Sequence, residues 1–332
     1  MRRILGPQKF CFADVGAARG IPSHLAVLGE VADLMLFEPD QNEADALRSY
    51  YKNSESARRV RIYPCALSKN GGMRILHVTN APTGSSLLRP KSKHAQDIGD
   101  EGYFYPLREV QIPTRKLSDV LVESETDRLD FIKLDVQGSE LEILEGLGSK
   151  FISGLTGLEL EIGMPGGYEE QPEFSEIDNF LRDHQLELFD IKPARSHRAK
   201  AGNAAYYPVK VFGVHPQSPA LNKRVWEVDA VYFRSPTFAS QQNDLDEIRR
   251  LVAMFCVYGM FQEAYSLTEC AAETRVYSPK QLGALQEDVR NWHRETEYCF
   301  AYKPWVFPYL QYLQRILRRL ACGRRRDRWR HM

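Results

Sequence analysis

The sequence predicts an α/β protein built on a doubly wound, seven-stranded sheet and followed by a C-terminal helical extension. Over the first two-thirds of the chain, short apolar runs alternate with amphipathic segments of helical periodicity, as in sheets whose parallel strands are joined by helices. After Arg234-Ser235-Pro236 the apolar residues recur three and four positions apart, which indicates helices alone. We therefore divide the chain into a domain over 1–236 and an extension over 237–332.

Seven short apolar segments bounded by polar or turn residues are expected to be the strands: 10–15, 34–37, 59–67, 129–135, 155–162, 186–191 and 225–233. Helices are predicted over 41–52, 138–147 and 173–184. The segment 68–116 is too long for a simple crossover. It contains a further expected strand over 73–79 and could form a lid over the sheet. In the extension, Gly259 is expected to separate two helices.

Composition excludes several classes of protein. The 332 residues include 44 Lys+Arg and 44 Asp+Glu, and no apolar run approaches the ~18 residues that a membrane span needs. The N-terminal residues lack the apolar stretch of a signal peptide. The six cysteines form no CxxC pair, so we expect buried thiols in a reducing compartment and no disulfide framework or zinc site. A cytoplasmic location is the expectation.

The balanced charge hides a basic C-terminus. Eight arginines lie between residues 315 and 330, opposed only by Asp327, which leaves 36 basic against 43 acidic residues elsewhere. Residues 309–320 have leucines along one side of a helix and arginines on the other, a pattern that can lie on an anionic membrane surface. A terminal helix docked on the domain explains the pattern as well. Nucleic acid is disfavoured, because no groove-reading motif accompanies the arginines.

A glycine-rich turn, Asp14-Val15-Gly16-Ala17-Ala18-Arg19-Gly20, follows the first expected strand and is predicted to lead into a helix. Its small residues let the backbone approach a ligand, and a helix N-terminus would present free N–H groups. Glu38, at the end of the second strand, is placed to accept hydrogen bonds from ribose hydroxyls. G-x-A-x-G departs from the dinucleotide fingerprint, so S-adenosylmethionine is favoured over a nicotinamide cofactor. A simple turn without a ligand is the alternative.

Two expected interior strands carry charged residues, although such strands are normally apolar on both faces. Lys133 and Asp135 lie on one strand, and Glu159 and Glu161 on the next. Asp135 could cap the following helix, and the glutamates could form structural ion pairs with Lys133 or Arg115, since buried unpaired charges are unfavourable. The functional interpretation places Glu161 beside Asp135 in a pocket.

The run FIKLDVQGSELEILEG over 131–146 resembles the signature of FkbM-type methyltransferases, which use S-adenosylmethionine to methylate hydroxyl oxygens. DVGAARG, FEPD, CALS, SSLLRP, PTRKLSDVL and WEVDAVYFR resemble further segments of that family in the same order, from about residue 10 to 235. The resemblance implies a class I, Rossmann-like methyltransferase sheet. It also implies O-methylation of a hydroxyl on a glycan or other small natural product. A non-catalytic binding or scaffold protein of the same fold is the alternative.

The resemblance also implies the site residues. Those expected to bind the cofactor are Asp14, Gly16, Ala17, Gly20, Glu38, Pro39, Ala66, Leu67, Ser68 and Asp135, with residues 66–68 near the adenine. A hydroxyl is a weak nucleophile, so Asp135 is the first candidate for a general base and Glu161 the second. A divalent metal held by these two carboxylates is the other way to activate the hydroxyl. The expected substrate-side residues are Ser85, Ser86, Tyr168 and His215.

Two further residues complete the expectations. His197 is a weaker candidate for the base, because a lone loop histidine is more often simply solvated. Gln137 is assigned no role, since the family accepts either Glu or Gln at that position.

Overall fold

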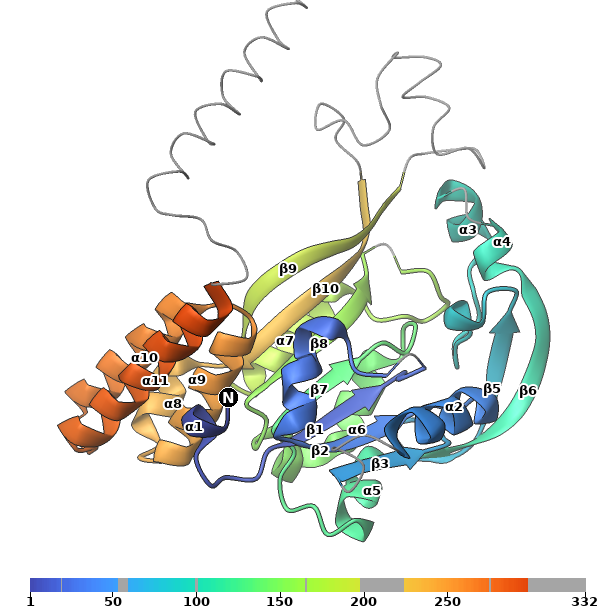
Figure 1. Ribbon diagram of the computed structural model, residues 1–332. Helices are drawn as coiled ribbons and strands as arrows, with labels where there is room; N and C mark the ends of the chain where they lie inside the picture. The colour runs from blue at the N-terminus through green and yellow to red at the C-terminus, as the bar shows by residue number, and fades with distance from the viewer. Residues whose placement is uncertain are drawn as a thin grey trace, which may run out of the picture.

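The computed structural model describes residues 1–18, 20–52, 59–98, 101–164, 166–197, 224–274 and 276–297 (Figure 1). A seven-stranded sheet of order β3-β2-β1-β7-β8-β10-β9 forms the centre and confirms the predicted fold. Its strands are β1 (Cys11–Val15), β2 (Asp33–Phe37), β3 (Val60–Tyr63), β7 (Phe131–Leu134), β8 (Gly157–Gly163), β9 (Leu186–His197) and β10 (Arg224–Arg234). Neighbouring strands are parallel except at β10, which is antiparallel to both β8 and β9.

The strand order reverses between β1 and β7. From β1 the chain moves outward through β2 to β3 and then returns to place β7 on the other side of β1. In open α/β sheets a crevice forms at the carboxyl ends of the strands where the order reverses, and ligands bind there. The fold therefore directs attention to the residues that follow β1 and β7.

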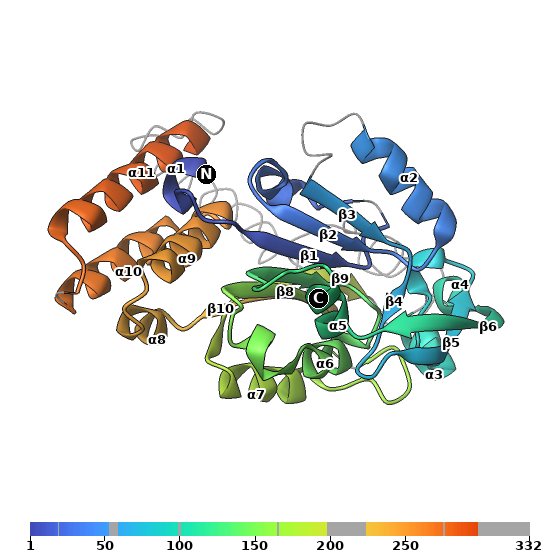
Figure 2. The same ribbon diagram turned by 90° about the horizontal axis from the view of Figure 1, so that it is seen from below.

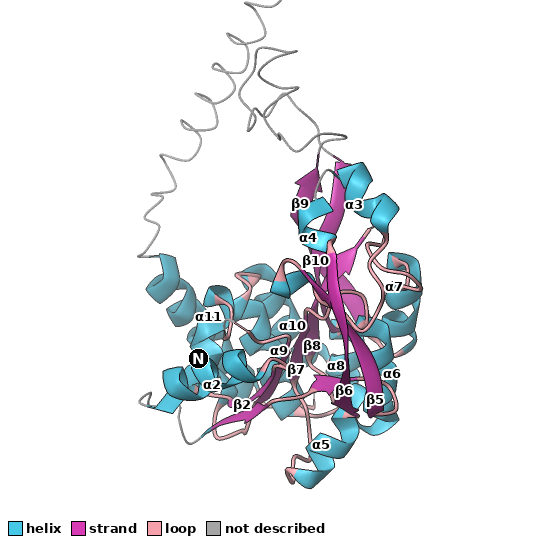
Figure 3. Cartoon of the chain, turned by 90° about the vertical axis from the view of Figure 1, so that its right-hand side faces the viewer, coloured by secondary structure: helices cyan, strands magenta, loops and turns pink. Residues whose placement is uncertain are grey.

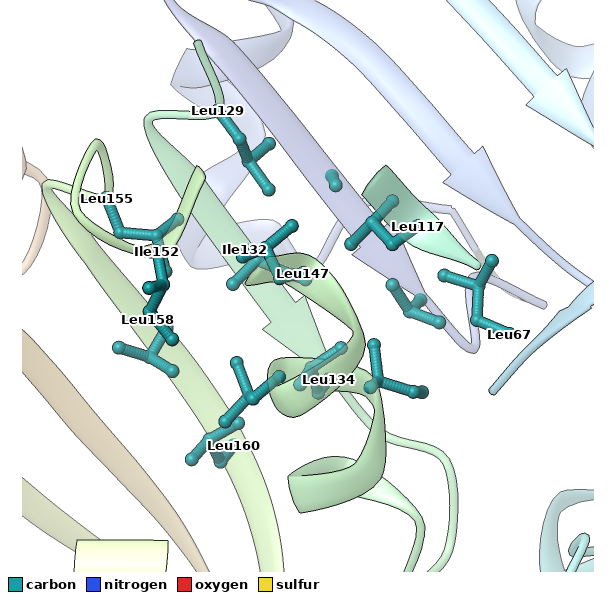
Figure 4. Close-up of a cluster of buried hydrophobic side chains, with 14 of the residues drawn as sticks. Leu67, Leu117, Leu129, Ile132, Leu134, Leu147, Ile152, Leu155, Leu158 and Leu160 are labelled. Carbon is teal, nitrogen blue, oxygen red and sulfur yellow. The ribbon is translucent and has the colours of Figure 1, made fainter. Parts of the chain in front are cut away.

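One face of the sheet is covered by α5 (Leu117–Glu123), α6 (Glu140–Ile152) and α7 (Phe174–Asp183). Aliphatic side chains fill the space between sheet and helices, as Figure 4 shows for Ile132, Leu134, Leu158 and Leu160 around Leu147 of α6. Successive side chains of a strand point to opposite faces of the sheet. Since 132, 134, 158 and 160 face α6, the charged residues at 133 and 159 must point to the other face.

The opposite face packs against α2 (Gln41–Lys52), the 3-10 helix η1 (Ser23–Glu30), α1 (Arg2–Leu5) and the C-terminal helices. The latter are α8 (Pro236–Gln241), α9 (Leu245–Val257), α10 (Phe261–Glu273) and α11 (Pro279–Glu297), and Gly259 lies between α9 and α10 as expected. Phe12, Phe131 and Phe233 of the sheet belong to the same buried cluster as Ile248 and Phe255 of α9. Figure 2 shows α1 grouped with these helices beside the sheet.

A buried ionic network reinforces this contact. Arg128 and Arg250 place Nε atoms 2.6 and 3.1 Å from Oδ1 of Asp130, and Arg128 also bonds to Glu247 of α9. The other oxygen of Asp130 accepts the N–H of Cys11 at 2.7 Å. The network thus joins α9 to the start of β1.

A second, three-stranded sheet was not anticipated. The third predicted strand, 59–67, divides at Pro64 into β3 and β4 (Ala66–Leu67), because proline has no N–H to continue a ladder. β4 joins β6 (Pro106–Arg115) and β5 (Gly72–Thr79) in the order β4-β6-β5, seen at the front of Figure 3. The expected strand over 73–79 is confirmed. The short helices α3 (Ser92–Ile98) and α4 (Glu101–Phe104) lie between β5 and β6 in the chain.

The prediction that the glycine-rich turn leads directly into a helix is wrong. The chain forms η1 there, and it begins only at Ser23, after Pro22. A residue before proline is biased away from helical backbone angles, so Ile21 separates the turn from any helix. No helix N-terminus therefore follows Gly20 directly.

None of the helices in the described ranges is both long and apolar enough to cross a membrane. The arginine-rich residues 309–320, His215 and Arg19 lie outside the described residues, as does the side chain of His197.

Candidate active site

A row of charged side chains crosses the sheet near the carboxyl ends of its central strands. Asp14 on β1 is opposite Lys133 on β7, and Lys133 is opposite Glu159 on β8. Paired residues of neighbouring strands share a face, so all three lie on the side away from α6. Asp135 and Glu161 come two residues later on the same face. The point where the strand order reverses is therefore lined with ionisable groups.

Lys133 connects the first acid of the glycine-rich turn with Asp135. Its Nζ lies 3.3 Å from Oδ2 of Asp135 and 4.0 Å from Oδ1 of Asp14. Asp14 is only 1% exposed, and no donor in the described part of the chain hydrogen-bonds to its Oδ1. Burial raises the pKa of Asp14 to about 7, although Lys133 opposes the rise. A buried carboxylate oxygen without a donor suits a cationic ligand.

Asp135 and Glu161 are joined by the amide of Gln137. Its Nε2 donates to Oδ1 of Asp135 at 3.0 Å and to Oε2 of Glu161 at 2.7 Å. Its Oε1 lies 2.9 Å from the hydroxyl of Tyr168, which donates to it. Gln137 therefore fixes the two carboxyl groups relative to each other and to the aromatic residue beside them.

The two carboxyl groups differ in protonation. Burial and the nearby carboxyl groups of Glu227 and Asp135 raise the pKa of Glu161 far above its ordinary value. Burial alone would also raise the pKa of Asp135, but Lys133 and hydrogen bonds from Glu161 and Gln137 lower it below the ordinary value. The pair therefore holds one proton on Glu161 and leaves Asp135 ionised.

The loop that carries Gln137 has a strained and well-anchored backbone. Gln137 has φ of 59° and Gly138 φ of 107°, both in the left-handed region. Oε1 of Glu140 accepts the N–H groups of Val136 and Gly138 at 3.2 and 3.1 Å, and Ser86 donates to the carbonyl of Gln137 at 2.7 Å. Asp135 is not the cap of α6, because Ser139 stands at that position.

The glycine-rich turn lies directly against this loop. An ideal Cβ on Gly16, which has φ of +84°, would lie 2.0 Å from the carbonyl oxygen of Asp135. The N–H groups of Gly16 and Ala17 donate to the carbonyl of Phe37 at 3.0 and 3.1 Å, which brings the turn against the end of β2. Position 16 therefore requires glycine, because any side chain there would collide with the backbone of Asp135.

Glu38 completes the residues suited to the cofactor. It is 6% exposed, its Oε1 accepts the N–H of Asp40 at 2.8 Å, and burial raises its pKa to about 7. The Glu38 carboxylate could therefore bind a ribose diol, and the donor-free oxygen of Asp14 could bind a cationic group. These residues fit S-adenosylmethionine, which has both.

The other residues expected near the cofactor have contacts within the protein or are exposed, and their role in binding stays a prediction. Ala17 and Gly20 contact Tyr51 and Leu47 of α2, and Pro39 is exposed. The remaining three are Ala66, which is half-buried, Leu67, which lies in the core, and Ser68, whose hydroxyl is 2.7 Å from that of Thr114.

A small cavity of about 30 Å³, about the space of one water molecule, opens beside Gln137 and Glu161. Tyr168, His94, Phe104 and Trp226 supply aromatic walls, and Gln171 and Glu227 add polar ones. The rings pack edge to face. The ring centroids of His94 and Trp226 are 5.4 Å apart, and those of Phe104 and Tyr168 are 5.7 Å apart. The cavity is wide enough for a hydroxyl group but not for a sugar ring.

The two serines expected on the substrate side bond to the protein itself. Ser85 accepts the N–H of Thr79 at 3.2 Å, and Ser86 is buried under the loop of Gln137. Tyr168 lines the cavity, and its hydroxyl also lies 2.9 Å from the carbonyl of Gly84. Of the three expected substrate-side residues that the structure describes, Tyr168 is the one that lines the cavity beside Glu161.

Several residues of the site were not identified from the sequence. Gln137 lies two residues after Asp135 in the signature run, and this position was the available signal. His94 and Trp226 carry no local signal, because they are 132 positions apart and meet only through the fold. Glu159 is paired neither with Lys133 nor with Arg115 by a close contact. It binds His24 at 2.9 Å and Tyr258 at 2.7 Å.

Within the described ranges, no three His, Cys, Asp or Glu side chains are grouped so as to hold a metal ion.

The sheet order, the glycine-rich turn after β1 and the acid after β2 define the class of S-adenosylmethionine-dependent methyltransferases. Residues 14–188, more than half of the chain, match the Methyltransferase FkbM domain, and the chain belongs to that family. It is a methyltransferase, and its family and fold imply S-adenosylmethionine as the methyl donor.

Two curated relatives are methyltransferases. Methyltransferase sdnD from Sordaria araneosa is 27% identical over 202 residues, which cover 55% of this chain and 75% of the relative. The 2-O-methyltransferase NoeI from Sinorhizobium fredii is 28% identical over 122 residues, covering 35% of this chain and 47% of the relative. Among solved structures, the FkbM methyltransferase from Methylobacillus flagellatus KT is 18% identical, with a TM-score of 0.36, covering 69% of this chain and 45% of that chain.

Proposed function

We propose that the protein transfers a methyl group from S-adenosylmethionine to a hydroxyl oxygen of a glycan or other small natural product. The observation that carries the proposal is the position of Asp135. Its backbone contacts Gly16 of the cofactor turn, and its carboxylate is joined through Gln137 to Glu161 at the cavity. One ionised carboxylate therefore lies between the two expected binding regions.

The residues around Asp135 support a base. S-adenosylmethionine, when bound, supplies an electrophilic methyl group, and transfer requires the acceptor oxygen to lose its proton. Asp135 would accept that proton, while Lys133 keeps its carboxylate ionised and Gln137 fixes its direction. Positioned proton transfer contributes roughly 10²–10⁴-fold in rate. Glu161 and Tyr168 would keep Asp135 and Gln137 in place, because each already donates its hydrogen to one of them.

The acceptor class is supported by the cavity and by one relative. Aromatic side chains with amide and carboxyl groups between them suit the apolar faces and hydroxyls of a sugar. The cavity has room for the reacting hydroxyl alone, so the rest of the acceptor would lie outside it or displace α3 and α4. The relative from Sinorhizobium fredii is named a 2-O-methyltransferase, which supports oxygen as the methylated atom.

The test uses the purified full chain, S-adenosylmethionine with a labelled methyl group, and the polysaccharides, glycolipids and small metabolites of the host. We expect label in a product that survives mild alkali, because methyl ethers resist base and methyl esters do not. Label found only in alkali-labile or amine products would contradict O-methylation. Calorimetry with S-adenosylmethionine separates the enzyme from a scaffold protein, since an enzyme must bind the cofactor.

We also propose a cytoplasmic location with the arginine-rich tail at an anionic membrane surface. The sequence of residues 309–320 supports the second part, and a lipid-linked glycan would then be a suitable acceptor. Flotation of the full chain with anionic liposomes, compared with a chain ending at Gln314, tests it. Equal flotation of the two would overturn the proposal.

A further inference from the structure

The C-terminal helices, which lie outside the matched family domain, reach the charged row through Tyr258. This residue directly follows α9, and its hydroxyl donates to Oε2 of Glu159 at 2.7 Å. Nε2 of His24 lies 2.9 Å from the same oxygen. The Tyr258 ring is held between aromatic neighbours, with centroids 5.3 Å from Phe233 and 6.1 Å from Phe131. The position of the hydroxyl is therefore fixed by packing.

Glu159 competes for the same cation as Asp135. It is opposite Lys133 in the sheet and only 5% exposed. A buried carboxylate needs hydrogen-bond donors, and an ammonium on the neighbouring strand would be one. In the structure, Tyr258 and His24 are the donors to Glu159, while Lys133 Nζ lies 3.3 Å from Asp135. The ammonium thus lies nearest Asp135, with Asp14 at 4.0 Å, and makes no close contact with Glu159.

We propose that Tyr258 is a positioning residue of the methyltransferase site, which satisfies Glu159 and thereby leaves the Lys133 ammonium with Asp135. The helical extension then contributes to catalysis without touching cofactor or acceptor. The proposal rests on the proposed role of Asp135 as the base.

Other ionisable groups face this region and set its background charge: Asp14 of β1, His24 of η1, Glu161 of β8, Glu227 and Asp229 of β10, and Asp190 and Lys192 of β9. Burial and Glu159 raise the pKa of Tyr258 well above its ordinary value, so the hydroxyl keeps its proton over the working range of pH. The hydrogen bond to Glu159 is therefore constant when Asp135 titrates.

Tyr258→Phe tests the proposal because it keeps the ring and removes the donor. Glu159 then attracts Lys133, and Asp135 loses part of its stabilisation as an anion. One hydrogen bond contributes about 1 kcal/mol, so we expect the Asp135 titration to move upward by about 0.5–1 pH unit. Adding Glu159→Gln removes the competing charge and should return the titration toward that of the unsubstituted protein.

The measurement is carbon-13 NMR of the full chain, labelled in the side-chain carboxyl of aspartate and titrated without cofactor or acceptor. The Asp135 signal is identified by its loss in Asp135→Asn. The matched control is Tyr265→Phe, since Tyr265 lies on α10 with its hydroxyl 3.5 Å from Gln286, far along the extension.

Any of three results would overturn the proposal. The Asp135 titration could be unchanged in Tyr258→Phe, Tyr265→Phe could reproduce the shift, or adding Glu159→Gln could leave the shift in place. Because no turnover is measured, failure here is distinct from failure of the proposed function. A chain that transfers no methyl group but shows the shift would refute only the proposed function.

Discussion

Gly16 and Asp135 are in direct backbone contact, because the carbonyl oxygen of Asp135 occupies the space that a β-carbon on residue 16 would need. The contact joins the turn expected to hold the cofactor to the loop expected to hold the base. A change that moves the backbone on either side must therefore affect both.

We expect Gly16→Ala to lower the free energy of unfolding by about 2–4 kcal/mol, through overpacking and a strained positive φ. It should also abolish calorimetrically detectable binding of S-adenosylmethionine. Gly72→Ala is the matched control, since Gly72 also has positive φ, +93°, but nothing lies within 4 Å of its added Cβ. If both variants bound the cofactor equally, the contact would have no functional importance.

Asp135→Asn and Glu161→Gln should have unequal effects on turnover. Asn cannot accept the proton, so we expect a loss of about 10²–10⁴-fold in kcat with cofactor binding retained. Gln resembles the protonated carboxyl of Glu161, whose pKa is raised by burial. The loss in kcat of Glu161→Gln should therefore be much smaller. Rates with the acceptor identified by the labelling screen test this. If Glu161→Gln lost more of its kcat than Asp135→Asn, Glu161 would be the base and Asp135 would not.

Asp14 should make the cofactor-free protein less stable as pH rises. Its native pKa of about 7 lies above the unfolded value of about 3.9, so the native state binds the extra proton between these values. The destabilisation is absent below about pH 4, grows up to about pH 7 and is constant above.

Asp14→Asn should therefore raise the free energy of unfolding at pH 8 by about 1–3 kcal/mol, the cost of an unsatisfied buried polar group, and weaken cofactor binding. At pH 4 it should have little effect. Denaturant titrations at the two pH values provide the measurement. Equal effects at both would show that the Asp14 pKa is not raised.

Glu247 should stabilise the folded protein without contributing to cofactor affinity. Glu247→Ala leaves Arg128 without its partner on α9, and breaking a buried ion pair costs about 3–5 kcal/mol. Glu287→Ala removes exposed pairs with Arg290 and Arg294 and should cost less than about 1 kcal/mol. Thermal unfolding compares the two, and cofactor affinity should be the same in both. A weaker affinity in Glu247→Ala alone would contradict the purely structural role.

The sequence predicted the central sheet because its strands are local apolar runs between polar turns. It also predicted that Asp135 and Glu161 would lie together, since both are near the carboxyl ends of neighbouring strands, Asp135 just after β7 and Glu161 within β8. The second sheet was missed because β4 has only two residues and pairs with β6 across some 50 residues, a separation that periodicity does not reveal.

The partners of the charged residues could not be predicted for the same reason. Glu159 depends on Tyr258, 99 positions later, and nothing in the local sequence around either residue indicates the other. A helix was expected after the glycine turn, and the 3-10 helix that forms there begins only at Ser23, after Pro22. Local patterns thus indicated which residues are unusual, and packing determined what each one contacts.

The shared cluster of Phe12, Phe131 and Phe233 with α9 has a consequence for biosynthesis. Although α1 and η1 also pack on this face, the cover over these aromatic residues is complete only when the ribosome has made the chain through Val257, well beyond residue 188 where the family match ends. A nascent chain that has completed β1, β7 and β10 still presents an apolar sheet face to its surroundings, and such faces are prone to aggregation. The last helices therefore complete the folding of the first strand.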